Sequence, residues 1–224
     1  MGATDVIKRF IGGVYSMAAD RIYEPLVVRG SFRLLGGTLN DLVAEQGRRA
    51  VEVAGDGPIL DMPVGTGYFT MAVARRHRGL VVGVDLAEGM VRHAQRVARE
   101  DGASNLAVVR ADAHRLPFKD GAFPAVLCSN GLQVIPGLEP TLSELARVLS
   151  PTGTLFASVV GIPISGALPS SVGERLPAIL RSERDLLRAM AQVGLARASA
   201  RRTRMAIVVE AQRLQEADPH AAVE

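Results

Sequence analysis

Residues 59–70 read ILDMPVGTGYFT: a short apolar segment, an acid, a glycine-rich turn and the start of a further apolar stretch. We predict a strand that begins at residues 58–60 and that Asp61 closes. Gly65 and Gly67 let the backbone turn tightly and approach a ligand, because glycine carries no Cβ. Residues 68–76 then predict a helix. A strand, a glycine-rich turn and a helix in this order begin a nucleotide-binding βα unit.

The acid before the turn narrows the choice of ligand. A dinucleotide fingerprint has a third glycine where this chain has Thr70, and it places a pyrophosphate on the helix N-terminus. The carboxylate of Asp61 would repel a pyrophosphate and attract a cation, by about 4 kcal/mol at about 4 Å in a surface-like dielectric before desolvation. The loop therefore predicts a positively charged nucleoside ligand, such as S-adenosylmethionine with its ammonium and sulfonium groups. The alternative is that Asp61 only caps the turn.

Length and composition favour one cytoplasmic α/β domain. The chain has 224 residues and a formal net charge of +3. Arginines are frequent between residues 175 and 204, but acids alternate with them and aromatic side chains for base stacking are absent there, so we expect no nucleic-acid partner. Cys128 is the only cysteine, which suits a reducing compartment. Without a signal-peptide pattern or an apolar run of about 20 residues, we expect no integral membrane segment.

Strand and helix patterns alternate along the rest of the chain, which predicts a doubly wound sheet. Strands are predicted at residues 80–84, 105–110, 125–128 and 154–160, with a closing pair at 196–203 and 205–211. Two or three helices are predicted within residues 6–19 and 26–53, with breaks at Pro25 and at Gly36-Gly37. Further helices are predicted at residues 87–99, 138–149 and 183–193, with a turn at 151–153. We expect a single domain over residues 1–224, with a helical cap at 1–57, a core at 58–212 and a tail at 213–224.

Polar residues follow three of these strands at their carboxyl ends. Asp85 is placed to accept hydrogen bonds from both ribose hydroxyls, each worth roughly 1.5–3 kcal/mol; the alternative is that it caps the following helix. Asp112 is placed to accept from an adenine amino group, with the backbone N–H of Ala113 offered to the ring. Ser129 follows the fourth strand, beside the glycine loop, at the switch point of the sheet where ligands bind.

Residues outside these tips are candidates to line a ligand pocket. Tyr23 and Glu24, with Tyr15, lie in the predicted N-terminal helices and can reach a pocket, although helix anchoring explains the tyrosines at least as well. Residues 161–177 form either a loop over the substrate pocket or a plain connector. A lone histidine such as His114 beside a binding loop is more often structural than catalytic. We expect no metal site. The sequence does not distinguish a homodimer from a monomer.

With these motifs in hand, the chain resembles the class I S-adenosylmethionine-dependent methyltransferases, most closely the small-molecule branch that includes the ubiquinone/menaquinone C-methyltransferases. The resemblance is strong over residues 57–158 and rests on several motifs in order. These are ILDMPVGTG (59–67), VVGVDLAEGM (81–90), RADAHRLPFKDGAFPAV (110–126) and ELARVLSPTGTL (144–155). The chain departs from the family at Pro63, usually glycine, at Pro124, usually aspartate, and at Gln133, often histidine. Glutamine cannot act as a general base at neutral pH.

The resemblance implies a seven-stranded, mostly parallel Rossmann-like sheet with helices on both faces and a reversed last strand. It implies methyl transfer from S-adenosylmethionine to an O, N or C nucleophile of a small apolar metabolite. Met90 is expected to pack on the adenine or, equally, in the core. The implied cofactor-binding residues are Asp61, Pro63, Gly65, Thr66, Gly67, Asp85, Leu86, Met90, Asp112, Ala113, Ser129 and Asn130.

Two other functions compete with methyl transfer. A nicotinamide-dependent oxidoreductase is disfavoured by Asp61 and Thr70. A regulator that binds the cofactor without transferring methyl stays open, because of the family departures and because only weak candidates for a general base, His114, Tyr23 and Glu24, are present. A nucleic-acid methyltransferase is disfavoured, because the chain lacks an Asn/Asp-Pro-Pro-aromatic motif.

Overall fold

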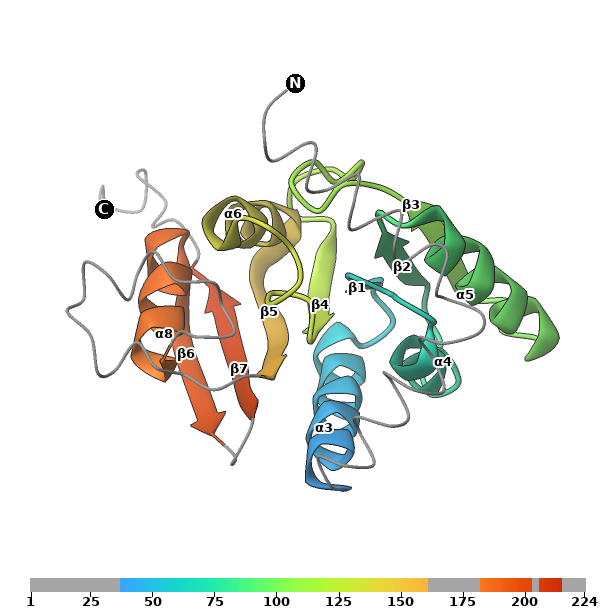
Figure 1. Cartoon of the computed structure of the whole chain (residues 1–224), viewed down its shortest axis with the longest axis horizontal. Helices are drawn as coiled ribbons and strands as arrows, with labels where there is room; N and C mark the ends of the chain where they lie inside the picture. The colour runs from blue at the N-terminus through green and yellow to red at the C-terminus, as the bar shows by residue number, and fades with distance from the viewer. Residues whose placement is uncertain (1–36, 161–181, 203–205, 215–224) are drawn as a thin grey trace, which may run out of the picture.

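The computed structural model describes residues 37–160, 182–202 and 206–214, which form one seven-stranded sheet with helices on both faces (Figure 1). The strand order is β3-β2-β1-β4-β5-β7-β6. The strands from β3 to β5 pair in parallel, whereas β7 runs antiparallel to its neighbours β5 and β6. The predicted doubly wound, mostly parallel sheet with a reversed last strand is confirmed.

The elements follow the predicted order along the chain. The strands are β1 (Ile59–Asp61), β2 (Val81–Asp85), β3 (Leu106–Arg110), β4 (Phe123–Ser129), β5 (Leu149–Val160), β6 (Leu195–Arg202) and β7 (Ala206–Arg213). The helices are α3 (Gly37–Ala54), α4 (Tyr68–Ala74), α5 (Glu88–Glu100), α6 (Leu138–Val148) and α8 (Glu183–Gln192). The N-terminal helical extension is present as α3. The predictions for residues 6–19, for Tyr15, Tyr23 and Glu24 and for residues 161–177 lie outside the described residues.

One predicted turn is wrong. Residues 151–153 were expected to separate a helix from a strand, but β5 already begins at Leu149. Leu149 pairs with Phe123 and Thr154 with Ala125, so the register shifts across this stretch and Thr152 takes a φ of 67°. The proline and glycine therefore form a bulge inside the strand. Pairing with β4, which is distant in sequence, extends the strand through residues that look locally like a turn.

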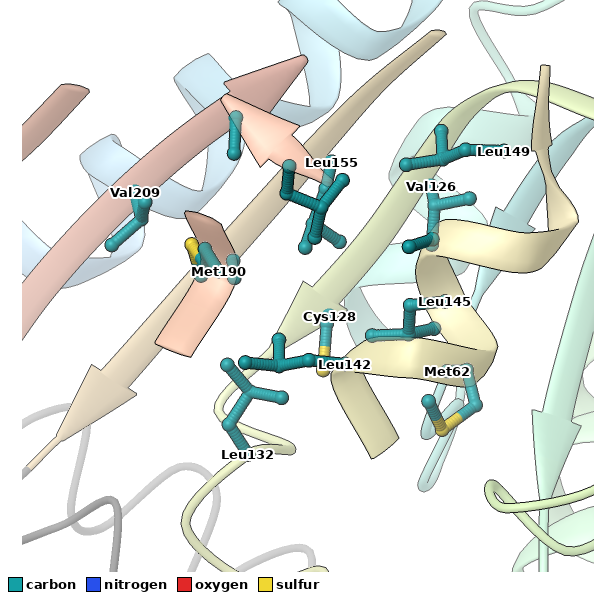
Figure 2. Packing of buried hydrophobic residues seen from close by; sticks show 14 of the residues in the cluster. Met62, Val126, Cys128, Leu132, Leu142, Leu145, Leu149, Leu155, Met190 and Val209 are labelled. Carbon is teal, nitrogen blue, oxygen red and sulfur yellow. The ribbon is translucent and has the colours of Figure 1, made fainter. Parts of the chain in front are cut away.

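The pleat of the strands sorts side chains into two cores. In β1, Ile59 belongs to the cluster under α3 and α4, while the next residue, Leu60, belongs to the cluster under α6 and α8. Figure 2 shows the second cluster, in which Leu142 and Leu145 of α6 lie near Val126 and Cys128 of β4. Both faces of the central strands are thus buried, which explains why these strands read as continuous apolar runs.

Helix α3 is tied to the sheet by a buried polar side chain. Gln46 is buried, and its Nε2 donates to the carbonyl oxygens of Ala157 in β5 at 3.0 Å and of Val209 in β7 at 3.2 Å. The amide therefore bridges the boundary between the parallel and antiparallel parts of the sheet. Among the described residues, no helix is both long and apolar enough to cross a membrane.

Candidate cofactor and methyl-transfer site

The predicted site residues gather at the carboxyl edge of the parallel strands. Strand β1 lies between β2 and β4, so the chain reverses its winding direction there. Asp61 ends β1, Asp85 ends β2 and Ser129 ends β4. Asp112 follows the end of β3 by two residues. The switch point of a doubly wound sheet is the usual place for a ligand.

Asp61 is the most constrained acid of this edge. Its side chain is 3% exposed, and the hydroxyl of Thr70 in α4 donates to its Oδ2 at 2.5 Å. Its Oδ1 is buried and has no hydrogen-bond partner in the described part of the chain. Burial raises the pKa of Asp61 from 3.8 to about 7; the Thr70 hydrogen bond opposes this rise and the negative charge of Asp85 adds to it. An unpartnered buried carboxylate oxygen fits a cationic ligand that donates hydrogen bonds.

The glycine loop is anchored to the neighbouring strand. Gly65 and Gly67 have φ values of 54° and 82°, and a Cβ on Gly65 would meet no atom within 4 Å. Backbone conformation, rather than space, therefore requires glycine at position 65. The N–H of Gly65 donates to Asp85 Oδ2 at 3.0 Å, and the N–H of Val64 donates to the Val84 carbonyl at 2.7 Å. The loop and the end of β2 thus form one unit.

Backbone N–H groups hold both carboxylate oxygens of Asp85. Its Oδ1 accepts from the N–H of Ala87, the N-cap residue of α5, at 2.9 Å, while Oδ2 accepts from Gly65. Burial raises the pKa of this carboxyl, and the backbone hydrogen bonds lower it again. The two carboxylate oxygens offer about four lone-pair positions, and the backbone N–H groups of Gly65, Leu86 and Ala87 occupy three, so acceptor capacity remains for a ligand hydroxyl. The backbone hydrogen bonds orient the carboxylate and leave part of its acceptor capacity unused.

Two predicted residues after β3 stand beside a histidine that is held in place. Asp112 Oδ1 accepts from the N–H of His114 at 3.0 Å, and Ala113 between them is buried. His114 Nε2 lies 3.1 Å from the hydroxyl oxygen of Thr141, which itself donates to the Gly137 carbonyl at 2.8 Å. Because the Thr141 proton is already used, Nε2 of His114 is the donor in this pair. This contact joins His114 to the start of α6.

The loop after β4 is shaped by a left-handed asparagine. Asn130 has a φ of 56°, a conformation that asparagine tolerates better than most residues. Its N–H lies 3.0 Å from both the carbonyl and the hydroxyl oxygen of Ser158 in β5. The Ser158 hydroxyl in turn donates to Asn130 Oδ1 at 3.1 Å. Asn130 is thus fixed on the side of the switch point opposite Asp85.

The remaining predicted residues differ in how they meet the site. Met90 is 1% exposed on α5, which agrees with its core-packing alternative. Thr66 is buried and Leu86 partly buried, both next to residues that anchor the glycine loop. Pro63 follows a cis peptide bond with Met62. The described residues contain no cluster of three or more histidine, cysteine or acidic side chains that could hold a metal ion.

Three residues of this site were not predicted from the sequence. Thr70 was considered only as a missing glycine, yet it holds Asp61. Ser158 holds Asn130 from 28 residues away. Gly131 lies where a Cβ would come within 2.1 Å of Pro63 Cδ. Only Gly131 left a local signal, because a glycine after a strand often marks a close approach of two backbones.

Comparison with known proteins supports this assignment of the fold and the motifs. A family model described as a methyltransferase domain matches residues 59–153. A demethylmenaquinone methyltransferase of Thermus thermophilus is 40% identical over 124 residues, which cover 54% of this chain and 56% of that protein. A malonyl-[acyl-carrier protein] O-methyltransferase of Halorhodospira halophila is 36% identical over 104 residues, covering 46% and 35%. The chain thus spans about half or less of the length of these relatives.

A solved structure is similar in fold over a larger share of the chain. Geranyl diphosphate C-methyltransferase from Streptomyces coelicolor, in complex with Mg²⁺, geranyl-S-thiolodiphosphate and S-adenosyl-L-homocysteine, has a TM-score of 0.62 to this chain. The identity is 18%, and the match covers 76% of each chain. At this identity the likeness concerns the fold alone. Together with the domain match, it confirms that the chain resembles the class I S-adenosylmethionine-dependent methyltransferases, with the ubiquinone/menaquinone C-methyltransferases among its similar sequences.

Proposed function

We propose that this protein transfers a methyl group from S-adenosylmethionine to a nucleophile of a small apolar metabolite. The observation that carries the proposal is Asp61, a buried acid at the switch point with an unpartnered oxygen. A cationic amino-acid moiety satisfies that oxygen, whereas a pyrophosphate would add negative charge beside two carboxylates. The methyltransferase-domain match over residues 59–153 supports the same cofactor.

The chain's residues divide the work of holding the cofactor. Asp61 accepts from the ammonium group, and the loop around Gly65 and Gly67 lies along the methionyl part. Asp85 and Leu86 hold the ribose, and Asp112 and Ala113 hold the adenine. Ser129 and Asn130 lie at the sulfonium end. Pro63 and Thr66 complete the set by packing around these groups, while Met90 packs in the core.

When bound, S-adenosylmethionine supplies an activated methyl group, so the protein's main task is alignment. Holding two reactants in line can contribute about 7–11 kcal/mol to lowering the barrier. The strand tips and the Ser158–Asn130 contact provide rigid supports for that alignment. A general base is needed only where the accepting atom must first lose a proton. His114, Tyr23 and Glu24 remain the candidates for that role.

The acceptor class follows from the sequence relatives. Proteins named for demethylmenaquinone and for malonyl-[acyl-carrier protein] are both similar to part of this chain. We infer an apolar metabolite with a nucleophilic ring carbon, oxygen or nitrogen, with a quinol as the first choice. We also propose a single cytoplasmic domain with no nucleic-acid partner. Sedimentation velocity distinguishes a monomer from a homodimer.

The test begins with binding and then measures turnover. We expect calorimetry to show that S-adenosylhomocysteine binds and that NADH does not. Incubation with methyl-labelled S-adenosylmethionine and a panel of quinols, phenols and acyl thioesters should label one class. Binding without labelling of any acceptor would favour the non-catalytic regulator. Binding of NADH in place of S-adenosylhomocysteine would contradict the proposal.

A further inference from the structure

A proline and a glycine from different loops interlock at the switch point. Pro63 lies two residues after the end of β1, and Gly131 lies two residues after the end of β4. The two strands are parallel neighbours, and the N–H of Met62 donates to the Leu127 carbonyl at 3.0 Å. A Cβ on Gly131 would lie 2.1 Å from Pro63 Cδ and 3.1 Å from Pro63 Cγ. The proline ring therefore occupies the space that any side chain at position 131 would need.

Space, rather than backbone conformation, demands glycine at position 131. Among the described glycines, Gly131 is not one of those with a positive φ, so alanine there would not be strained by a left-handed backbone conformation. The second obstacle to a Cβ is Cys128 Sγ at 2.9 Å. Real Cβ atoms do not approach a carbon at 2.1 Å, so one of the two loops would have to move.

Each partner of this contact is adjacent to a proposed cofactor contact. Pro63 precedes Val64 and Gly65, whose N–H groups bond to the end of β2. Gly131 follows Asn130, which Ser158 holds from β5. The contact therefore connects the loop proposed to lie along the methionyl part with the loop proposed to lie at the sulfonium. It also involves Pro63, one of the positions at which this chain departs from the related family.

We propose that Pro63 and Gly131 are a matched pair of positioning residues that sets the distance between the glycine loop and the Asn130 loop. The inference rests on the proposed function, because the two loops matter only if they hold the same cofactor. A fixed φ at Pro63 and the absence of a side chain at Gly131 leave the two loops little freedom to slide. Changing either partner alone should displace the amino-acid end of the cofactor and leave the nucleoside end in place.

The experiment compares Gly131→Ala, Pro63→Gly and the double variant in the full chain. Two probes are titrated by calorimetry: S-adenosylhomocysteine, and 5′-methylthioadenosine, which lacks the amino-acid part. We expect Gly131→Ala to raise the Kd for S-adenosylhomocysteine at least tenfold and the Kd for 5′-methylthioadenosine less than threefold. The double variant should recover S-adenosylhomocysteine affinity to within threefold of Pro63→Gly, because the added methyl group then has room.

A matched control separates the two obstacles to a Cβ. Cys128→Ala combined with Gly131→Ala removes the sulfur but leaves the proline ring, so it should show no recovery. Recovery with Cys128→Ala and none with Pro63→Gly would overturn the pairing. Equal losses for both probes would overturn a positioning role and indicate general damage to the fold.

Two further measurements keep the proposal testable. If Gly131→Ala does not fold, Pro63→Gly alone should raise the Kd for S-adenosylhomocysteine about three- to tenfold with 5′-methylthioadenosine unaffected, and an unchanged Kd would contradict the proposal. Thermal melts of the single and double variants report the interlock without any ligand. Wild-type protein that binds no S-adenosylhomocysteine would refute the proposed function, whereas non-additive melting temperatures would still support the packing of the pair.

Discussion

The two edges of the parallel sheet differ in how fully their main buried polar side chains are hydrogen-bonded within the protein. At the carboxyl edge, Asp61 is buried with one oxygen unpartnered among the described residues and a pKa raised to about 7. At the amino edge, Nδ2 of Asn105 donates hydrogen bonds of 3.2 Å or less to three carbonyl oxygens, those of Ala74, His77 and Gly79. His77 Nε2 at that edge also lies 2.8 Å from the Gly57 carbonyl.

We propose from this difference that the amino edge serves stability and the carboxyl edge serves a ligand. The amide nitrogen of Asn105 is satisfied by backbone carbonyls of the protein itself. His77 Nδ1 has no described partner, but an unpaired ring nitrogen costs less than an unpaired carboxylate. An acid held without a full set of partners is costly unless a ligand completes it. Variants at the two edges should therefore separate binding from stability.

The largest effect is expected at Asp85. Asp85→Ala removes the acceptor proposed for two ribose hydroxyls, and bonds to a charged acceptor are worth roughly 1.5–3 kcal/mol each. We expect the Kd for S-adenosylhomocysteine to rise at least about 100-fold by calorimetry. Asp101→Ala, at an exposed acid that pairs with Arg75 after α5, is the matched control and should leave the Kd within twofold. An unchanged Kd for Asp85→Ala would contradict the proposed ribose contact.

The next effect belongs to the opposite edge and should appear in stability. Asn105→Ala removes the amide that joins the end of α4 to the start of β3, and the carbonyls that it leaves are partly buried. We expect a loss of about 2 kcal/mol in the free energy of unfolding, measured with urea. The Kd for S-adenosylhomocysteine should change less than twofold. A loss of affinity as large as that of Asp85→Ala would contradict the proposal that the amino edge serves stability rather than ligand binding.

A pH dependence follows from Asp61. The folded carboxyl ionises at about pH 7 and the unfolded one near 3.8, so the folded state binds more protons between these values. The free energy of unfolding should fall as pH rises through this window and level off above it. A cationic ligand favours the ionised form, so S-adenosylhomocysteine affinity should rise about tenfold from pH 6 to pH 8. Asp61→Asn should abolish both slopes, and a slope that persists would assign it to another group.

The smallest effect is expected at Thr70. Its hydroxyl lowers the pKa of Asp61, so Thr70→Val should raise that pKa further. The midpoint of the affinity change should move to higher pH by up to about one unit, while affinity at pH 8.5 stays within about threefold. Thr70→Ser keeps the hydroxyl and should keep the wild-type midpoint. A midpoint that does not move in Thr70→Val would show that this bond has no influence on Asp61.

The carboxyl edge was largely predictable because its signals are local. Strands β1 and β2 are apolar runs that end in an acid, and Asp112 follows β3 by two residues, so Asp61, Asp85 and Asp112 could be placed from sequence spacing alone. The order of motifs then predicted the order of the strands. The boundaries at α5, α8 and β2 agree with prediction to within one residue.

The unpredicted features depend on contacts between distant residues. The bulge in β5 arises because β4 pairs on both sides of residues 151–153. The bond from Thr70 to Asp61 requires α4 to lie over the end of β1, and the bond between Ser158 and Asn130 joins two strands. The fit of Gly131 against Pro63 depends on fractions of an ångström. Apart from the glycine at position 131, none of these features leaves a signal in the pattern of a single segment.

The two hydrogen bonds that Gln46 donates have a practical consequence for anyone who wishes to shorten the chain. The matched methyltransferase region, residues 59–153, excludes both this glutamine and the carbonyls of Ala157 and Val209 that it reaches. A chain cut down to that region would lack α3 on one face of the sheet. It would also lose most of β5, so β4 would become an edge strand with its apolar side chains exposed. Boundaries of recognisable motifs and boundaries of autonomous folding therefore do not coincide here, and expression trials should retain everything from Gly37 to Arg213.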